Sequence, residues 1–267
     1  MTERAKPLDT DDVQAPAPDY QRRKWDGIEL VAHNDIIEAL TVVLTRFGTL
    51  YEWARSVTQP LVLRGRAPVY VAQVPGSAGT MLVVRHAWHG GLLAPFTRDV
   101  FVRPTRAPNE LRISGALRSC NIGTPELLAY ALYDAGPGVV RVDVASRYIP
   151  DSYDFAVVLA GLSPIVPRLE AFVAIEALLR KLAQHRFTHP DLNVKNVLLS
   201  ERNHLAVASV LDVDVMQQNP GMSTSNVMEI NANRLARSMT KSREQFGVHI
   251  TDEEIEAFRQ RLIHSVQ

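Results

Sequence analysis

The sequence predicts an α+β fold with two lobes, an antiparallel sheet in the amino-terminal lobe and mainly helix in the carboxy-terminal lobe. Short apolar runs separated by glycine- and proline-bearing turns fill residues 61–148, which is typical of antiparallel strands. Beyond residue 150, apolar residues recur at helical spacing instead. With 267 residues, 46% of them hydrophobic, the chain is long enough to build two such lobes.

The amino-terminal part divides into a tail, 1–26, and a lobe, 27–150. The tail is predicted to be flexible because its first residues mix Thr, Asp, Glu, Lys and Pro without an apolar core segment. The lobe is predicted to begin with a helix from Asn34 to Gly48. Further elements follow from apolar runs and turns: strands at 61–63, 69–71 and 81–84, a helix at 105–119, and a hairpin of 127–133 with 139–148.

The carboxy-terminal lobe, 151–267, is predicted to start after Pro150-Asp151-Ser152. A helix beginning at Ser163-Pro164 carries an apolar stripe from Leu169 through Val173 to Leu182, which we interpret as core packing. The last helix starts at a capping box formed by Thr251 and Glu254.

Composition excludes several classes of protein. Lys and Arg total 29 and Asp and Glu total 29, so no excess of positive charge points to a nucleic-acid partner. Neither a secretory signal nor a run of about 18 uncharged apolar residues is present in the sequence. The single cysteine, Cys120, suits a reducing compartment. We therefore expect a cytoplasmic protein whose membrane contact, if it has any, is peripheral.

The polar residues from His189 to Asp212 form the main functional motif. Asp191 is followed five residues later by Asn196, and Asp212 comes after a short hairpin-like interval. This order matches a kinase phosphoryl-transfer site, where the protein orients a hydroxyl and holds metal ions on the phosphates. Asp191 would accept the proton of the hydroxyl, while Asn196 and Asp212 would offer oxygen ligands to Mg²⁺. His189 would brace the loop.

The alternative is that these are ordinary turn residues. A lone Asp or Asn between apolar runs usually bonds nearby backbone in a turn or cap. Four such residues in kinase order favour the site over a coincidental pattern of strands and turns.

Several motifs together resemble the family of lipopolysaccharide core kinases that act on heptose or Kdo (3-deoxy-D-manno-octulosonic acid), and most closely its Kdo branch. The motifs are Arg85-His86 with Gly90-Gly91-Leu92 and Arg98-Asp99, Thr105-Arg106 with Asn109-Glu110-Leu111, Arg147-Tyr148-Ile149-Pro150, the loop 189–196, the segment 211–214 and the segment 231–238. This resemblance implies a protein-kinase-like bilobal fold.

The resemblance also implies roles for individual residues. Asp191 and His189 would be catalytic, together with Arg85 and its partner Glu110, although these last two could also form an ordinary solvated ion pair. Residues of both lobes would contact ATP, namely Gly65, Arg66, Arg85, Arg147, Tyr148, Asn196 and Asp212.

Two segments depart from the expected pattern or remain ambiguous. Ala67-Pro68 stands where the family has a glycine-rich turn, and it removes backbone freedom and an amide that could bind phosphate. The segment from Arg85 to Arg98 could bind an anionic sugar or lipid phosphate, or it could be a covering loop. His86 and His89 alone do not predict a zinc site.

The expected function is transfer of phosphate from ATP, with Mg²⁺, to a sugar hydroxyl in lipopolysaccharide core biosynthesis. The acceptor implied by the resemblance is Kdo on a lipid A precursor at the cytoplasmic face of the inner membrane. Alternatives are a kinase acting on another small hydroxylated molecule or on protein Ser or Thr. A pseudokinase that serves as a binding module is a third possibility, motivated by Ala67-Pro68.

Overall fold

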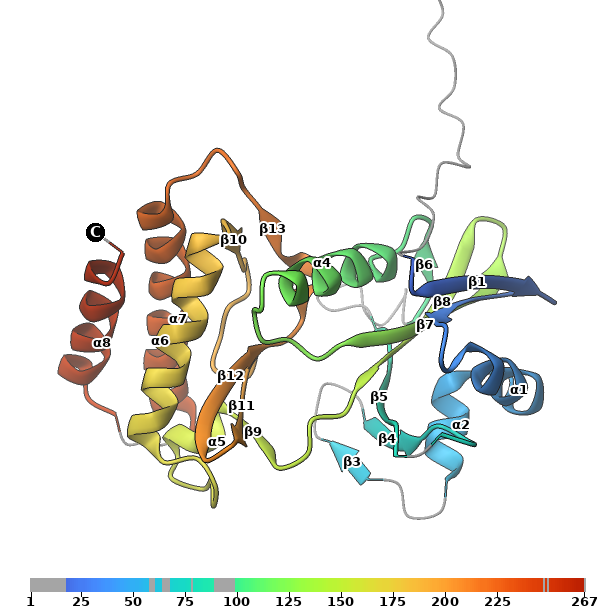
Figure 1. Ribbon diagram of the computed structural model, residues 1–267, viewed down its shortest axis with the longest axis horizontal. Helices are drawn as coiled ribbons and strands as arrows, with labels where there is room; N and C mark the ends of the chain where they lie inside the picture. The colour runs from blue at the N-terminus through green and yellow to red at the C-terminus, as the bar shows by residue number, and fades with distance from the viewer. Residues whose placement is uncertain are drawn as a thin grey trace, which may run out of the picture.

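The computed structural model describes residues 18–57, 61–63, 68–77, 79–88, 99–246, 248 and 250–266. Figure 1 shows an antiparallel sheet with its covering helices at one end and a mainly helical part at the other, so the predicted α+β architecture is confirmed. Among the described residues, no helix is both long and apolar enough to cross a membrane.

The large sheet belongs to the amino-terminal part. Its order is β1-β2-β7-β8-β5-β4-β3, neighbouring strands run antiparallel, and β6 pairs with β8. The strands are β1 (Tyr20–Trp25), β2 (Ile28–His33), β3 (Leu61–Leu63), β4 (Val69–Gln73), β5 (Met81–His86), β6 (Phe101–Val102), β7 (Leu127–Gly136) and β8 (Val139–Arg147).

The predicted flexible tail to residue 26 is wrong for residues 20–25, which form strand β1. Its two-residue connection to β2, Asp26-Gly27, has positive φ at both positions (43° and 75°), as tight hairpin turns require. Charged residues dominate β1, so it lacks an apolar pattern. It is held by pairing with β2, whose Leu30 and Ala32 are fully buried.

Helices cover both faces of this sheet. On one face lie α1 (Ile37–Phe47) and α2 (Leu50–Ser56), which share an apolar core with strands of the sheet. On the other lies α4 (Ala107–Ser119), whose Ala107 joins a second cluster with β7 and β8. The far end of α4, with Ile113 and Leu117, packs into the core of the carboxy-terminal part instead. Helix α4 therefore contacts both cores.

The carboxy-terminal part surrounds one large apolar core. A short sheet in the order β12-β11-β9 and the pair β10-β13 lie beside its helices. The elements are β9 (Ser152–Asp154), α5 (Phe155–Leu159), α6 (Arg168–Gln184), β10 (Phe187–Thr188), β11 (Val197–Arg202), β12 (Leu205–Val210), the 3₁₀ turn η1 (Val213–Val215), β13 (Gln217–Gln218), α7 (Thr224–Phe246) and α8 (Asp252–His264). The predicted capping box of Thr251 and Glu254 is present.

The helix predicted from Ser163 begins five residues later, at Arg168, after Pro167. The prediction of a core stripe is wrong for Leu169 and Val173, which are 81% and 69% exposed, whereas Phe172 packs against the core. Leu178 and Leu182, further along α6, are buried as predicted. One face of α6 thus belongs to the core, where the helix packs against β12 and α7.

Candidate active site

The loop from His189 to Asn196 connects β10 to β11. The Asp191 side chain is exposed, whereas Asn196 is buried and its amide nitrogen donates to the Asp191 carbonyl oxygen at 2.9 Å. Asn193 closes the turn between them by accepting hydrogen bonds from the backbone of Lys195 and Asn196. The loop thus exposes the carboxylate of Asp191 to solvent, while the amide of Asn196 is buried and hydrogen-bonded to the backbone of Asp191. That bond uses the nitrogen of Asn196 and leaves its oxygen for another partner.

His189 lies fully buried under this loop. Its Nε2 is 2.9 Å from the carbonyl oxygen of Leu211, and its Nδ1 accepts the backbone N–H of Asp191 at 3.2 Å. A carbonyl can only accept and a backbone N–H can only donate, so the ring is neutral with its proton on Nε2. Burial lowers the pKa of His189 and favours the same neutral form. The ring joins the loop to the end of β12.

One face of α7 supports the loop from the other side. Asn231 accepts the backbone N–H of His189 at 3.1 Å and donates to the carbonyl of Phe187 at 3.0 Å. Arg234 donates to the carbonyl of Pro190, and Ser238 accepts the backbone N–H of Val194 at 3.0 Å. These three residues, at spacings of three and four, lie on one face of the helix. We call Asn231, Arg234 and Ser238 the α7 brace.

The hairpin of β11 and β12 brings Asp212 beside Asn196. The two strands pair from Val197 with Val210 outward, and the N–H of Leu211 donates to the Asn196 carbonyl at 2.9 Å. Asp212 follows with φ 51° and ψ 47°, a left-handed conformation that Asp tolerates better than most residues. Its side chain is exposed. The predicted pair of oxygen ligands therefore lies at neighbouring backbone positions.

Arg85 and Glu110 meet as an ion pair. Nη2 of Arg85 lies 2.6 and 2.5 Å from the two carboxylate oxygens of Glu110, with the side chains 34% and 11% exposed. Burial alone would lower the pKa of Arg85, but the charge of Glu110, followed by those of Asp212 and Asp214, raises it. The guanidinium of β5 therefore stays charged and feels the carboxylates that follow β12.

Helix α4 also binds the segment that carries Asp212. Asn109 donates to the backbone carbonyl of Asp214 at 2.9 Å, and the Arg106 guanidinium lies 3.4 Å from the Asp214 carboxylate. Glu110 is the next residue along the helix. The position of the Arg85–Glu110 pair and that of Asp212 are thus linked through the first turns of α4.

Two other predicted nucleotide contacts, Arg147 and Tyr148, lie at the end of β8 and bind residues outside the loop 189–196. Arg147 pairs with Glu126 at 2.8 Å, and Arg118 of α4 pairs with the same carboxylate at 2.5 Å. Tyr148 continues the sheet, its N–H donating to the Met81 carbonyl at 2.9 Å. Within the described part of the chain, neither residue forms a hydrogen bond or ion pair with the loop 189–196. The remaining predictions, Gly65 and Arg66, lie outside the described residues.

The described residues hold no group of three or more His, Cys, Asp or Glu side chains that could bind a metal by themselves. Asn196 and Asp212 nevertheless suit Mg²⁺, which commonly binds through one or two protein oxygens, retained waters and the phosphates of the substrate. The donor set therefore fits a metal that arrives with a nucleotide. It does not fit an all-protein metal cage.

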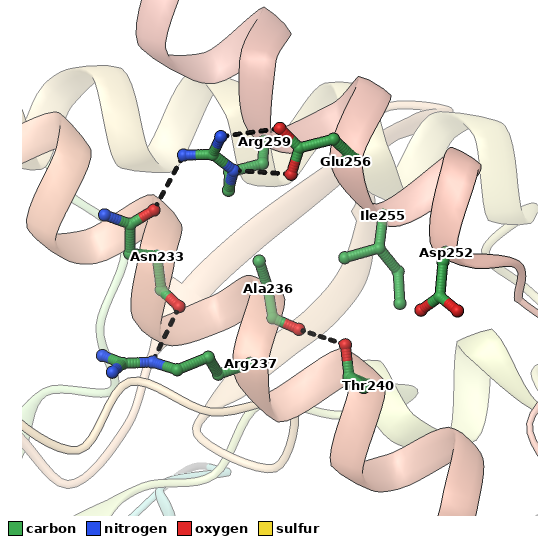
Figure 2. Close-up of a pocket in the computed structure, with 8 residues that line it drawn as sticks. All are labelled: Asn233, Ala236, Arg237, Thr240, Asp252, Ile255, Glu256 and Arg259. Carbon is green, nitrogen blue, oxygen red and sulfur yellow. Dashed lines mark hydrogen bonds and ion pairs between the residues drawn. The ribbon is translucent and has the colours of Figure 1, made fainter.

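A pocket of about 490 Å³ lies away from these residues, between α7 and α8 (Figure 2). Asn233 and Arg237 face it from α7, whereas the α7 brace faces the loop. Arg259 already binds Glu256 through Nε at 2.8 Å and Asn233 at 3.0 Å. The pocket contains none of the predicted site residues.

Sequence reasoning missed the individual roles of the α7 brace, of Asn109 and of Asp214. The segment 231–238 stood out as a motif, and polar residues at helical spacing in it were the available signal. Their loop partners lie 42 to 44 residues away in sequence, so spacing alone could not identify them.

Comparisons with known proteins identify the family of the chain. Residues 65–261 match the model of the lipopolysaccharide kinase (Kdo/WaaP) family. The chain is 26% identical to a 3-deoxy-D-manno-octulosonic acid kinase of Actinobacillus succinogenes, over 78% of this chain and 86% of that protein. It is 24% identical to the kinase of the same name from Haemophilus influenzae, over 71% and 78%.

A solved structure described as WaaP in complex with acyl carrier protein has a similar fold. Its TM-score is 0.50 at 14% identity, and the match covers 84% of this chain and 86% of that chain. The protein-kinase-like fold expected from the sequence is thus supported by structure as well as by family. The chain belongs to the lipopolysaccharide kinase (Kdo/WaaP) family and is a kinase.

Proposed function

We propose that the protein transfers the γ-phosphoryl group of ATP to a hydroxyl of Kdo on a lipid A precursor. The observation that carries this proposal is the exposed carboxylate of Asp191 above the buried amide of Asn196, with Asp212 at the adjoining strand end. The names of the relatives, which are Kdo kinases, support the acceptor. The nucleotide would bind between the lobes 27–150 and 151–267.

Each group has a defined task in this proposal. Asp191 accepts the proton of the acceptor hydroxyl as its oxygen attacks the γ-phosphorus in line, and the bond to the β-phosphate oxygen breaks. Asn196 and Asp212 would hold Mg²⁺, which would neutralise charge on the phosphates. Arg85, fixed by Glu110, binds phosphate oxygens from the opposite side. Neutral His189 and the α7 brace keep the loop in place.

The acceptor would be reached from the cytoplasmic face of the inner membrane through a peripheral contact, since a lipid A precursor lies in that membrane. Arg147 and Tyr148, at the end of β8, are placed by this proposal beside the nucleotide base, at the connection between the lobes. Nucleic acid has no part in it.

Transfer of radiolabelled phosphate from ATP to a Kdo-bearing lipid A precursor, with Mg²⁺, tests the proposal. Asp191→Asn keeps the size of the side chain but removes the base, so turnover should fall by about 10²- to 10⁴-fold. Asp35→Asn is a matched control, because Asp35 is 83% exposed at the start of α1. Transfer to another acceptor but not to Kdo would refute the acceptor and keep the kinase mechanism.

ATP binding can be tested without any acceptor. A ligand at 100 times its dissociation constant stabilises the folded state by about 2.7 kcal/mol, which raises the melting temperature. We expect such a shift with ATP and Mg²⁺ and a smaller one with ATP and a chelator. Absence of both shifts would contradict nucleotide binding.

A further inference from the structure

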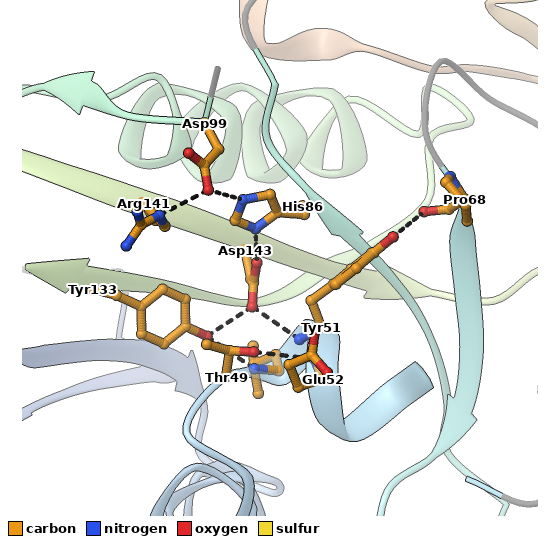
Figure 3. A network of polar contacts seen from close by, with 10 residues as sticks. Thr49, Tyr51, Glu52, Pro68, His86, Asp99, Tyr133, Arg141 and Asp143 are labelled. Atoms are coloured by element: carbon orange, nitrogen blue, oxygen red, sulfur yellow. Dashed lines mark hydrogen bonds and ion pairs between the residues drawn. The ribbon is translucent and has the colours of Figure 1, made fainter. Parts of the chain in front are cut away.

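A second polar network, shown in Figure 3, joins the large sheet to helix α2. Its centre is His86, the residue after Arg85 on β5. Successive side chains of a strand point to opposite faces, so Arg85 points towards α4 and His86 towards α2. The catalytic function proposed above gives His86 no role.

The imidazole of His86 lies between two carboxylates. Its Nδ1 is 2.6 Å from Asp143 of β8, and its Nε2 is 3.2 Å from Asp99. Ionised carboxylates accept hydrogen bonds and cannot donate them, so both ring nitrogens must carry protons. Burial alone would lower the pKa of His86, but its hydrogen bonds to Asp143 and Asp99 and their charges raise it. The ring is an imidazolium.

The charged groups around the imidazolium balance one another. Asp143 is fully buried, and it also accepts the hydroxyl of Tyr133 at 2.8 Å and the backbone N–H of Tyr51 at 2.9 Å. Asp99 accepts Nε of Arg141, on β8, at 2.8 Å. Removing the imidazolium would leave the buried charge of Asp143 without its cation, which is costly in a protein interior.

The network reaches the segments that border the proposed phosphate site. Tyr51, in the first turn of α2, donates its hydroxyl to the Pro68 carbonyl at 3.0 Å. Pro68 directly precedes β4, which pairs with β5. The rings of Tyr51 and His86 lie 5.6 Å apart, and those of His86 and Trp88 lie 5.3 Å apart. The His86 imidazolium therefore links the end of β5 with helix α2 and, through Tyr51, with the start of β4.

We infer that protonated His86 is a positioning residue, which holds the end of β5 and the start of β4 so that Arg85 meets the phosphates of the nucleotide. This inference rests on the proposed function and deepens it. His86 touches neither nucleotide nor acceptor in this account. It acts on the position of Arg85 through the backbone of the strand that they share.

The test compares His86→Gln with His264→Gln, a matched change at an exposed position near the end of α8. Glutamine can hydrogen-bond but carries no charge, so the Kd of ATP with Mg²⁺ should rise about tenfold in the first variant, the equivalent of about 1.4 kcal/mol. The KM for ATP should rise with it, while kcat changes less. Equal affinity in both variants would overturn the inference.

The pH profile gives a readout that a merely structural role would not move. Above the raised pKa of His86 the ring loses its charge, so the affinity of the intact protein for ATP should weaken as the pH passes that value. The affinity of His86→Gln should lack this step. Among the described residues, the titratable groups in contact with the ring are Asp143, Asp99 and Tyr51, while Tyr133 bonds to Asp143 and Arg141 to Asp99. A step retained in His86→Gln would overturn the assignment to His86.

A second variant keeps the test valid if His86→Gln does not fold. Asp143→Asn preserves shape and removes one charge, so NMR titration of the His86 ring should give a lower pKa than in the intact protein. The ordinary value of 6.5 in the intact protein would overturn the inference. Intact protein that binds ATP but phosphorylates no Kdo would refute the proposed acceptor alone. Intact protein that binds no ATP would overturn both proposals.

Discussion

Each of the two lobes contains a largely buried histidine, and the two differ in charge. His189 supports the loop of the carboxy-terminal part as a neutral ring bonded to backbone groups, whereas His86 lies between two carboxylates as an imidazolium. Both side chains are largely or fully buried, so burial alone does not decide the difference. The partners decide it, because a carbonyl and an N–H fix a neutral tautomer while two carboxylates require two donors.

This difference suits the two tasks that we propose. The loop has to present the Asp191 carboxylate in one geometry, and neutral hydrogen bonds from Asn231 and Ser238 of the α7 brace help to hold it there. The sheet has to hold a permanently charged arginine at a fixed place. A buried ionic network does so with strong hydrogen bonds, but it makes the position dependent on pH.

Removal of the Asn231 side chain from the α7 brace should have the largest effect on stability. Asn231→Ala leaves the N–H of His189 and the carbonyl of Phe187 buried without partners, which costs about 2–4 kcal/mol in the free energy of unfolding. Urea denaturation measures the loss, and Asn226→Ala, at an exposed position of the same helix, is the control. A loss no larger than that of the control would show that the brace is not needed.

The junction between α4 and β12 gives the next largest effect. A Cβ built on Gly123 would lie 2.4 Å from the backbone oxygen of Ala208, and the Gly123 carbonyl accepts the N–H of Val210 at 2.8 Å. Gly123→Ala should therefore destabilise the fold by about 1–3 kcal/mol, as overpacked sites do. Gly115→Ala, where the added atom meets nothing within 4 Å, should be neutral or stabilising by comparison. Equal stability of the two variants would mean that this close approach is absent in solution.

The ion pair of the amino-terminal lobe should affect activity more than stability. Glu110→Gln keeps the shape but leaves Arg85 without its counter-charge, so kcat/KM for ATP should fall about tenfold, or about 1.4 kcal/mol. Glu229→Gln, at an exposed site on α7, is the matched control. An unchanged kcat/KM in Glu110→Gln would identify the pair as an ordinary surface contact.

The two histidines should give the smallest and most specific effect, on stability against pH. The raised pKa of His86 means that its stabilisation is complete below 6.5 and is lost as the pH rises through the folded value. The lowered pKa of His189 means that stability falls as the pH drops below 6.5 towards its folded value. Urea denaturation from pH 5 to 9 of the intact protein, His86→Gln and His189→Gln measures both. Loss of both effects in either single variant would contradict the assignment.

Sequence reasoning predicted best those features whose residues lie close together along the chain. Asp191, Asn196 and Asp212 lie within 22 residues of one another, and the β11–β12 hairpin brings the last two together. The capping box of Thr251 and the hydrophobic run to Leu182 were also readable, since both depend on neighbours along the chain. The family resemblance supplied the pairing of Arg85 with Glu110, which are 25 residues apart.

Two of the features that sequence reasoning missed depend on tertiary packing. Leu169 and Val173 fit a helical stripe but lie exposed on α6. Asp143 lies 57 residues from His86, and no periodicity connects them. A local pattern does not contain such packing. Strand β1 is a different case, because it is rich in charge but pairs with its neighbour β2 through the turn Asp26-Gly27, which is a local hairpin signal.

The central claim is that Asp191 is the base of a kinase that acts on Kdo. The most direct measurement is phosphate transfer from radiolabelled ATP to a Kdo-bearing lipid A precursor by the intact protein and by Asp191→Asn, both shown by melting temperature to be folded. The account predicts transfer by the intact protein and a fall of about 10²- to 10⁴-fold in the variant. Equal transfer by the two proteins would contradict it.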